Sequence, residues 1–429
     1  MTIVACSTPP GVSGIAVVRI SGKGAIKNIS TFVKNSPFDE KNPLSRVCFL
    51  VDKDGEVFDE AVVTSYISPN SYTGENLVEI SCHGNPKIIS KIIDLSVDAG
   101  SKLAEAGEFT KTAFLNGKLD LSEAEAVASI IHSLSLTGVK AGVKNLKGGL
   151  SKEIHSIKSS LISVVANLEF NLDISEEDLQ PNLLKQSEAA VLEVSKKLND
   201  CILCFEETKM FQSGASVVIL GPPNAGKSTL FNRLVNKNQS IVTSVEGTTR
   251  DVIEKNISIN GLPILLKDTA GIRDSGDDVE KIGVERSFVE AKDADLVIIL
   301  NDKKLSFGDT KHIHVFNKSD IKTPNKKYDI SISAKTGSGV KQLKEAVYKN
   351  LIGNKIQTDT LLISKRQCNA IKGALKHIKD AHSLLLAGDS IELLVEDINR
   401  SIDFLDSITK KTTKDDVLSA VFSSFCVGK

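Results

Sequence analysis

The stretch Val217–Leu230, which reads VVILGPPNAGKSTL, constrains the fold of this chain more than any other. Its first four residues are an apolar run typical of a buried strand, and Gly221–Ser228 fits the pattern G-x-x-x-x-G-K-[ST] of a phosphate-binding loop. The glycines let backbone N–H groups curl around phosphate oxygens, and the helix-compatible run that follows directs its positive dipole end at them. We therefore predict a nucleotide site, with Lys227 on the β- and γ-phosphates and Ser228 on Mg²⁺, rather than a merely structural turn.

The residues around this loop, from about 213 to 354, alternate apolar strands with helical stretches, as in a doubly wound α/β domain. Asn260-Gly261 is a strong hairpin signal, so one antiparallel pair is expected to interrupt an otherwise parallel sheet. The predicted strands are Val217–Leu220, Glu254–Ile259, Ile264–Lys267, Leu296–Leu300, His312–Phe316 and Tyr328–Ile332.

Four short motifs follow the phosphate loop in a fixed order. TTR at Thr248–Arg250 offers a threonine to the Mg²⁺ shell, and DTAG at Asp268–Gly271 places a carboxylate on a Mg²⁺-bound water. NKSD at Asn317–Asp320 ends in a carboxylate that can accept hydrogen bonds from the N1–H and N2 amine of guanine, a pair that adenine lacks. SAK at Ser333–Lys335 can close over the base through backbone N–H groups. Together the motifs predict a guanine-nucleotide site.

The residue that activates the attacking water does not stand at the position used by Ras-type GTPases. There a glutamine shortly after DTAG-like motifs orients the water, whereas here Ile272 follows Gly271 and has no polar group. We select Glu280 for this role; the alternative is a solvated glutamate at the start of a helix. Asn224 in the phosphate loop can help to hold a monovalent cation in place of an arginine finger.

Two further regions differ in pattern from this α/β stretch. Up to about Gly117, β-rich runs at Ile15–Ile20, Val47–Val51, Ala61–Tyr66 and Leu77–Ser81 are interleaved with helical stretches such as Lys87–Ala99, which predicts an α+β domain. The loops Thr8–Gly14 and Ser68–Gly74 are interpreted as connections.

From about Leu119 the pattern is helical, with Leu161, Val164, Val165 and Leu168 on one face. Helix returns after residue 364, with an apolar stripe at Ile391, Leu394, Val395, Ile398, Ile402 and Leu405. Cys201 and Cys204 lie in an apolar helical stretch and are interpreted as core residues rather than a metal or redox site.

These changes in pattern predict a multidomain protein. A length of 429 residues by itself leads us to expect roughly three domains. Residues 1–118 form an α+β domain, and residues 119–212 with 355–429 form one discontinuous all-α helical domain. Residues 213–354 form an inserted Ras-like α/β P-loop domain. The inserted domain lets the two helical segments bury their stripes against each other.

Composition limits the setting of the protein. The net charge of -1 gives the chain no polycationic face, so nucleic-acid contacts require a local patch or a partner. Seven cysteines, scattered from Cys6 to Cys426, do not resemble a disulfide framework, and no cleavable apolar segment opens the chain, so we expect a cytoplasmic setting. No apolar run approaches about 18 residues, so no membrane contact is expected.

Several stretches spread over the whole chain carry a resemblance to a known family. They read TPPGVSGIAVVRISG, SPNSYTGENLVEISCHGNP, GEFTKTAFLNGKLDLSEAEA, GPPNAGKSTLFNRL, EGTTRD, DTAGIRD, VEKIGVERS and FSSFCVGK. This combination closely resembles the tRNA-modification GTPase MnmE (TrmE) family.

The resemblance implies a GTP hydrolase that works with an FAD-dependent partner of the MnmG (GidA) type in a hetero-oligomer. Together they install an aminomethyl-type group, such as carboxymethylaminomethyl, at C5 of the wobble uridine of certain tRNAs. It also implies a homodimer, a folate-binding and dimerisation domain at the N-terminus, and an inserted domain that dimerises around K⁺ during hydrolysis.

The resemblance assigns residues by matching positions. Arg19, Glu79, Lys118 and Lys429 would contact a formyl-tetrahydrofolate, and Ser228 and Thr249 would hold Mg²⁺. Asn224, Thr243, Val245 and Thr248 would coordinate K⁺, Glu280 is the water-positioning glutamate, and Cys426 takes part in the modification chemistry or is a buried tail cysteine. The predicted nucleotide-binding residues are Asn224, Ala225, Gly226, Lys227, Ser228, Thr229, Thr243, Ser244, Val245, Glu246, Gly247, Thr248, Thr249, Asp268, Thr269, Ala270, Gly271, Asn317, Lys318, Asp320, Ser333, Ala334 and Lys335.

The alternative function is a regulatory GTP-binding switch that acts through partner binding, for instance in ribosome assembly. Such a switch needs the same inserted domain but has no need of the Arg19, Glu79 and Lys118 group or of the segment Cys426–Lys429. The regions outside the inserted domain therefore favour the modification enzyme.

Overall fold

The computed structural model shows two compact units. It describes residues 1–172, 181–236, 253–268, 289–302, 310–323, 328–353, 361, 363–387, 390–409, 418, 421–423 and 425–429. The first unit comprises residues 1–128, 145–194 and 373–429, and the second comprises residues 129–144 and 195–372. The division into three domains at the boundaries given above stays a prediction.

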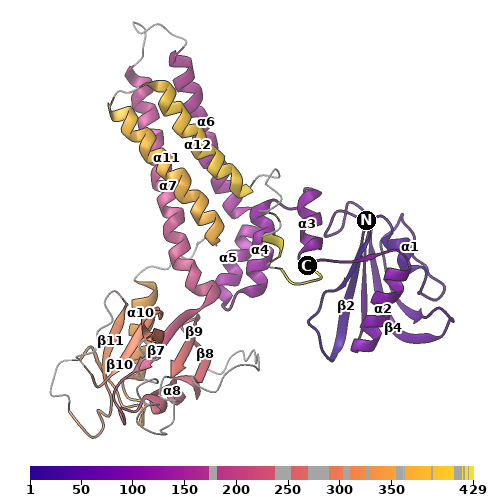
Figure 1. The fold of residues 1–429 in the computed structure, drawn as a ribbon, viewed down its shortest axis with the longest axis horizontal. Helices are drawn as coiled ribbons and strands as arrows, with labels where there is room; N and C mark the ends of the chain where they lie inside the picture. Colours follow the sequence, from indigo (N-terminus) through magenta and orange to yellow (C-terminus); the bar gives the residue numbers. More distant parts are fainter. Residues whose placement is uncertain are drawn as a thin grey trace. The chain divides into compact units, whose positions relative to one another are not determined.

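A six-stranded sheet organises the N-terminal part of the first unit, in the order β3-β4-β5-β2-β1-β6 (Figure 1). Its strands are β1 (Ile3–Cys6), β2 (Ser13–Ser21), β3 (Leu44–Val51), β4 (Val57–Tyr66), β5 (Leu77–Gly84) and β6 (Lys102–Leu103). Helices α1 (Ala25–Ile29) and α2 (Pro86–Asp98) cover one face and bury a core that includes Val18, Ile20, Ile80 and Ile92. The predicted α+β domain is confirmed, although β1 and β6 were not foreseen.

The helical part of the first unit has a separate core, which includes Phe114 of α3 (Glu108–Leu115) with Leu121 and Phe422. In this unit α6 (Gly149–Leu172) packs along α12 (Ile391–Thr409), as Figure 1 shows. Leu161, Val164 and Leu168 are buried on α6, as are Leu394, Ile398 and Leu405 on α12, while Val165, Ile391, Val395 and Ile402 are half-buried. Two segments far apart in sequence thus bury each other's apolar stripes, as the pattern predicted.

Further helices are α4 (Leu121–His132), α5 (Leu136–Leu146), α7 (Pro181–Ser213) and α11 (Lys365–Ala387). On α7, Cys201 is buried and Cys204 half-buried. Among the described residues, no group of three or more His, Cys, Asp or Glu side chains is arranged to hold a metal. In the same described part of the chain, no helix combines the length and the apolar character needed to cross a membrane.

The second unit contains a six-stranded sheet in the order β12-β11-β10-β7-β9-β8. Its strands are β7 (Ala215–Leu220), β8 (Ile253–Ile259), β9 (Leu262–Asp268), β10 (Leu296–Leu300), β11 (His312–Phe316) and β12 (Ile330–Ser331), with helices α8 (Lys227–Asn236) and α10 (Val340–Ile352). Only β8 and β9 pair antiparallel among these strands, across Asn260 and Gly261 with φ of 52° and 82°. The predicted hairpin in a parallel sheet is confirmed, and β12 is shorter than predicted because its ladder with β11 has two pairs.

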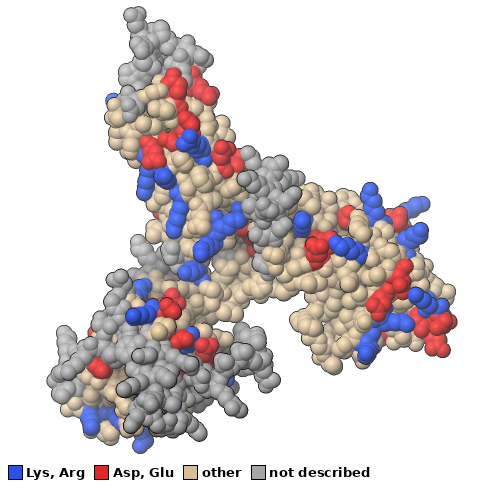
Figure 2. Space-filling view, viewed as in Figure 1, with Lys and Arg blue, Asp and Glu red and all other residues tan. Residues whose placement is uncertain are grey.

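Charges are interspersed on the described surface. Figure 2 shows Lys and Arg mixed with Asp and Glu on the visible face of the described residues, with no single large field of one sign. This distribution agrees with the net charge of -1. Contacts with a polyanion would therefore depend on local groups or on a partner.

Candidate functional site

The loop between β7 and α8 has the backbone shape that a phosphate cradle needs. Gly221, Asn224 and Gly226 all have positive φ, at 152°, 60° and 91°. A Cβ on Gly221 would lie 2.5 Å from the carbonyl oxygen of Leu300, and one on Gly226 would lie 2.4 Å from Nδ2 of Asn317. Larger residues at these two positions would therefore collide with the neighbouring strand ends.

Lys227, the first residue of α8, folds back over this loop. Its Nζ donates to the carbonyl oxygens of Gly221 at 2.9 Å and Pro222 at 3.2 Å. Burial lowers the pKa of Lys227 below its ordinary value, and the charge of Asp268 opposes that shift. Asp268 is itself buried at the end of β9, and Ser228 is exposed at the start of α8. The oxygens of Ser228 and Asp268 are the kind that Mg²⁺ prefers.

Asn317 ties three strand ends together. Its Nδ2 donates to the carbonyl of Ala225 at 2.8 Å, and its Oδ1 accepts from the N–H of Ala334 at 2.9 Å. Its own N–H donates to Oδ1 of Asn301 at 2.7 Å. The side chain is 3% exposed, so these bonds are not exchanged with water. The phosphate loop and the Ser333–Lys335 turn are thereby held at one edge of the sheet.

Asp320 lies in a fixed turn beyond β11 with its carboxylate exposed. The N–H of Ser319 donates to the carbonyl of Ile332 at 3.0 Å, and that of Ile321 donates to the carbonyl of Lys318 at 3.1 Å. Lys318 has a φ of 70°. The carboxylate is thus free to receive donors from outside, on a backbone set by neighbouring segments.

The turn at Ser333–Lys335 is held from α8 by a residue that sequence reasoning missed. Arg233 donates from Nε to the carbonyl of Ala334 at 3.0 Å and from Nη2 to the carbonyl of Lys335. The sequence shows only an arginine about two helical turns after Lys227, and nothing in it indicates which residues this arginine contacts.

Many of the predicted nucleotide-site residues have described positions. The structure places Asn224, Ala225, Gly226, Lys227, Ser228, Thr229, Asp268, Asn317, Lys318, Asp320, Ser333, Ala334 and Lys335 in the strand-end loops of the second unit or in the first turn of α8. Residues 243–249 and 269–271 and Glu280 lie outside the described residues, so of the predicted K⁺ ligands only Asn224 is described.

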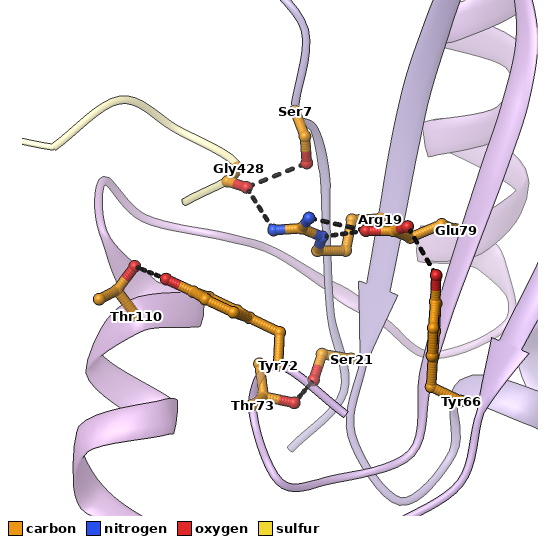
Figure 3. Close-up of polar contacts among 9 residues, drawn as sticks. All are labelled: Ser7, Arg19, Ser21, Tyr66, Tyr72, Thr73, Glu79, Thr110 and Gly428. Atoms are coloured by element: carbon orange, nitrogen blue, oxygen red, sulfur yellow. Dashed lines mark hydrogen bonds and ion pairs between the residues drawn. The ribbon is translucent and has the colours of Figure 1, made fainter. Parts of the chain in front are cut away.

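A second group of polar residues lies on the sheet of the first unit (Figure 3). Arg19 and Glu79 are cross-strand neighbours on β2 and β5. Oε1 of Glu79 accepts from Nη2 and Nε of Arg19 at 2.7 Å and 3.0 Å, and the two side chains are 12% and 25% exposed. Oε2 lies 3.4 Å from the hydroxyl of Tyr66, which donates to it. A carboxylate has about four acceptor positions, so Glu79 retains capacity for further donors.

Aromatic rings flank the guanidinium of Arg19. Its Cζ lies 5.4 Å from the ring centroid of Tyr72 and 5.6 Å from that of Phe109. The Tyr72 hydroxyl is hydrogen-bonded to Thr110 at 2.8 Å, so the ring is anchored on α3. Burial raises the pKa of Tyr72, which stays a neutral phenol. Sequence reasoning missed Tyr66, Tyr72 and Phe109, because nothing local in the pattern brings them to Arg19.

The segment Cys426–Lys429 reaches this group. The carbonyl of Gly428 accepts from Nη1 of Arg19 at 3.2 Å and from the Ser7 hydroxyl at 2.9 Å, as Figure 3 shows. Gly428 has a φ of 92°, and a Cβ there would lie 2.5 Å from the carbonyl oxygen of Cys6. Burial first, and then the nearby Arg19 charge, lower the pKa of Lys429. Lys429 directly follows Gly428, whose carbonyl contacts Arg19. Cys426 is exposed, so the alternative of a buried tail cysteine is wrong.

Lys118 lies on the adjoining loop. Its Nζ donates to the carbonyl of Pro69 at 3.1 Å, and Asn116 donates from Nδ2 to the carbonyl of Thr73 at 2.8 Å. The Thr73 hydroxyl is bonded to Ser21 at 2.7 Å in a buried position. Lys118 thus contacts the loop that carries Tyr72, and among the described residues it makes no hydrogen bond to Arg19 or Glu79. Together the group offers a carboxylate acceptor, cations and the partly exposed rings of Tyr66 and Tyr72, which suits a flat, anionic heterocyclic ligand.

Known proteins match this chain over both the loop group around Lys227 and the polar group around Arg19. A model of the MnmE helical domain matches residues 121–426, and one of the GTP-binding protein TrmE N-terminus matches residues 2–118. The tRNA modification GTPase MnmE of Aquifex aeolicus is 38% identical over 100% of this chain and 99% of its own length. That of Thermotoga petrophila is 36% identical over 100% of both.

Among solved structures, the G domain of the T. maritima FeoB iron transporter matches 32% of this chain and 98% of that chain, with 25% identity and a TM-score of 0.23. The full-length identity to the two bacterial relatives covers both units of the chain. The chain belongs to the MnmE (TrmE) family of tRNA modification GTPases.

Proposed function

We propose that this protein is a K⁺-dependent GTP hydrolase that acts in tRNA modification with an FAD-dependent partner of the MnmG type. Together they install an aminomethyl-type group, such as carboxymethylaminomethyl, at C5 of the wobble uridine. The observation that carries the proposal is the identity of 38% to a tRNA modification GTPase over the full length, which includes both groups of residues described above. A homodimer and a cytoplasmic location belong to the same proposal.

In the proposed nucleotide site, Lys227 neutralises phosphate charge, Ser228 and Thr249 hold Mg²⁺, and Asp268 accepts from a Mg²⁺-bound water. Bound Mg²⁺ supplies charge stabilisation to the transferred phosphoryl group. Asp320 selects guanine, and Glu280 orients the attacking water. Support for these roles comes from the positions of Lys227 at the start of α8, Asp268 at the end of β9 and Asp320 in the turn after β11.

Asn224 is proposed as a K⁺ ligand together with Thr243, Val245 and Thr248. We expect hydrolysis to be roughly tenfold or more faster in K⁺ than in Na⁺ at equal ionic strength, because a cation beside the phosphates takes the part of an arginine finger. Phosphate release measured in matched chloride salts tests this. Asn224→Gly deletes the side chain but tolerates the φ of 60° and is expected to remove the difference. Equal rates for the unmodified protein in both salts would exclude the cation role.

Arg19, Glu79, Lys118 and Lys429 are proposed to bind a formyl-tetrahydrofolate. Glu79→Gln is expected to weaken its binding by roughly tenfold or more, because a charged acceptor of N–H donors becomes neutral. Calorimetry with 5-formyltetrahydrofolate measures this, and the control is Glu60→Gln, which changes an exposed glutamate of β4. A thermal melt of each variant separates ligand loss from the effect on the partly buried Arg19. Unchanged affinity with an unchanged melt would contradict the assignment.

The function itself is tested by nucleoside analysis of tRNA from cells that lack this protein. We expect loss of a C5-substituted wobble uridine and its recovery when the gene is restored. Unchanged tRNA nucleosides, with GTP hydrolysis intact, would favour the alternative of a regulatory switch that acts through partner binding.

A further inference from the structure

The turn that follows β12 has its backbone N–H groups almost fully engaged. The N–H of Ser333 donates to the carbonyl of Ser338 at 2.9 Å, and the N–H of Gly337 donates to the carbonyl of Ser333 at 2.8 Å. The N–H of Ala334 donates to Asn317, and that of Thr336 donates to the Ser333 hydroxyl at 3.1 Å. Among the described residues of this turn, only Lys335 has a backbone N–H group without an acceptor.

Arg233 binds two consecutive carbonyl groups of this turn, those of Ala334 and Lys335. It donates from Nε to the carbonyl of Ala334 at 3.0 Å and from Nη2 to the carbonyl of Lys335. The guanidinium also packs on Gly337, where an added Cβ would lie 3.1 Å from Nη1. A planar fork bound to two carbonyls fixes orientation as well as distance, which a lysine ammonium cannot do.

One of these carbonyls shares a peptide plane with the available donor. The C=O of Ala334 and the N–H of Lys335 belong to the same trans peptide, so they point in opposite directions. Fixing the carbonyl on Arg233 therefore turns the N–H of Lys335 away from α8. A cationic donor on the carbonyl also polarises the peptide and makes its N–H a better donor.

We propose that Arg233 is a positioning residue for purine recognition, which orients the Lys335 N–H toward O6 of the guanine base. The inference rests on the proposed binding of guanine nucleotides at this site. Guanine presents a carbonyl at C6, which accepts this bond, whereas adenine presents an amine, which sets donor against donor. Arg233 thus adds selection at C6 to the selection at N1 and N2 proposed for Asp320.

The test compares two ligands on four proteins. GDP and 6-thio-GDP both keep N1–H and the 2-amine, but the sulfur at C6 is a weaker acceptor, so the change of their affinity ratio between variants reports the C6 contact. Dissociation constants are measured by calorimetry with the unmodified full-length protein, Arg233→Met, Arg233→Lys and Asn232→Ala. Asn232 is the neighbouring exposed residue on α8 and serves as the matched control.

We expect the unmodified protein and Asn232→Ala to bind 6-thio-GDP about tenfold more weakly than GDP, the effect of one hydrogen bond in a dry site. In Arg233→Met the affinity for GDP falls about tenfold and the ratio between the ligands approaches one. Arg233→Lys is expected to resemble Arg233→Met, since it keeps the charge without the fork. It also provides the comparison if Arg233→Met does not fold.

Three results would overturn the inference. Equal weakening of both ligands by Arg233→Met, with the ratio kept, would make Arg233 a structural residue only. If Arg233→Lys keeps both the affinity for GDP and the ratio between the two ligands, Arg233 contributes only its positive charge. If the unmodified protein binds GDP with no preference over 6-thio-GDP, the C6 contact is absent. If it binds no GDP at all, the proposed function itself is excluded.

Discussion

Asp320→Asn is expected to lower the affinity for GDP by roughly 1000-fold and to raise that for xanthosine diphosphate by a comparable factor. A site built to pair with polar base edges rejects a base that leaves those groups unpaired by such factors. The asparagine amide can donate to the C2 carbonyl of xanthine but meets the 2-amine of guanine as a second donor. The exposed carboxylate lies on a turn fixed by Ser319 and Ile332, so the substitution leaves the backbone in place.

The measurement is calorimetry with both diphosphates, and Asp293→Asn is the control. Asp293 is another exposed aspartate of the same unit, far in sequence from the base-binding motifs. We expect its substitution to change neither affinity nor stability by a measurable amount, as for most surface changes. An Asp320→Asn protein that still rejects xanthosine diphosphate would contradict the assignment of Asp320 to the base.

Glu280→Ala is expected to lower the turnover of GTP by roughly 100-fold or more while the affinity for GTP stays nearly unchanged. The physical reason is that the side chain acts on the water in the transition state and not on the bound nucleotide. Ile272 stands after Gly271 and has no group that could take over this part. Glu280 lies outside the described residues, so its role stays a prediction from the sequence.

Single-turnover hydrolysis in K⁺, together with equilibrium binding, separates the two effects. Glu345→Ala removes an exposed glutamate of α10 and is expected to leave both quantities unchanged. A fall in affinity that accounts for the whole loss of rate would make Glu280 a structural residue instead.

Strong local patterns predicted much of the fold. The apolar runs of β7 and β10 are long enough to be recognised alone, and Asn260-Gly261 predicted the one antiparallel pair among the described strands of the second unit's sheet. Because neighbouring parallel strands end at the same edge, the motifs after them were expected to lie together. The structure places Asn317 at that edge, bonded to both the phosphate loop and the Ser333–Lys335 turn.

Elements defined by distant contacts were not predictable. β1 is four residues long and β6 only two, which is too short to show a period, and they form because each finds a partner strand. Arg233 and Tyr66 are ordinary residues in their local sequence. Their partners, Ala334 and Glu79, are 101 and 13 residues away, and no local pattern encodes those contacts.

The bond between the Ser7 hydroxyl and the carbonyl of Gly428 joins residues 421 positions apart. During synthesis, a ribosome releases the N-terminal strands long before residue 428 emerges, so the sheet folds while Arg19 still lacks one of its acceptors. Phe422 and Phe425, buried against α3 and α4, then bring the segment to its place. The polar group around Arg19 is therefore completed only after residue 428 has been translated, and a product that stops before this residue would carry the sheet without these contacts.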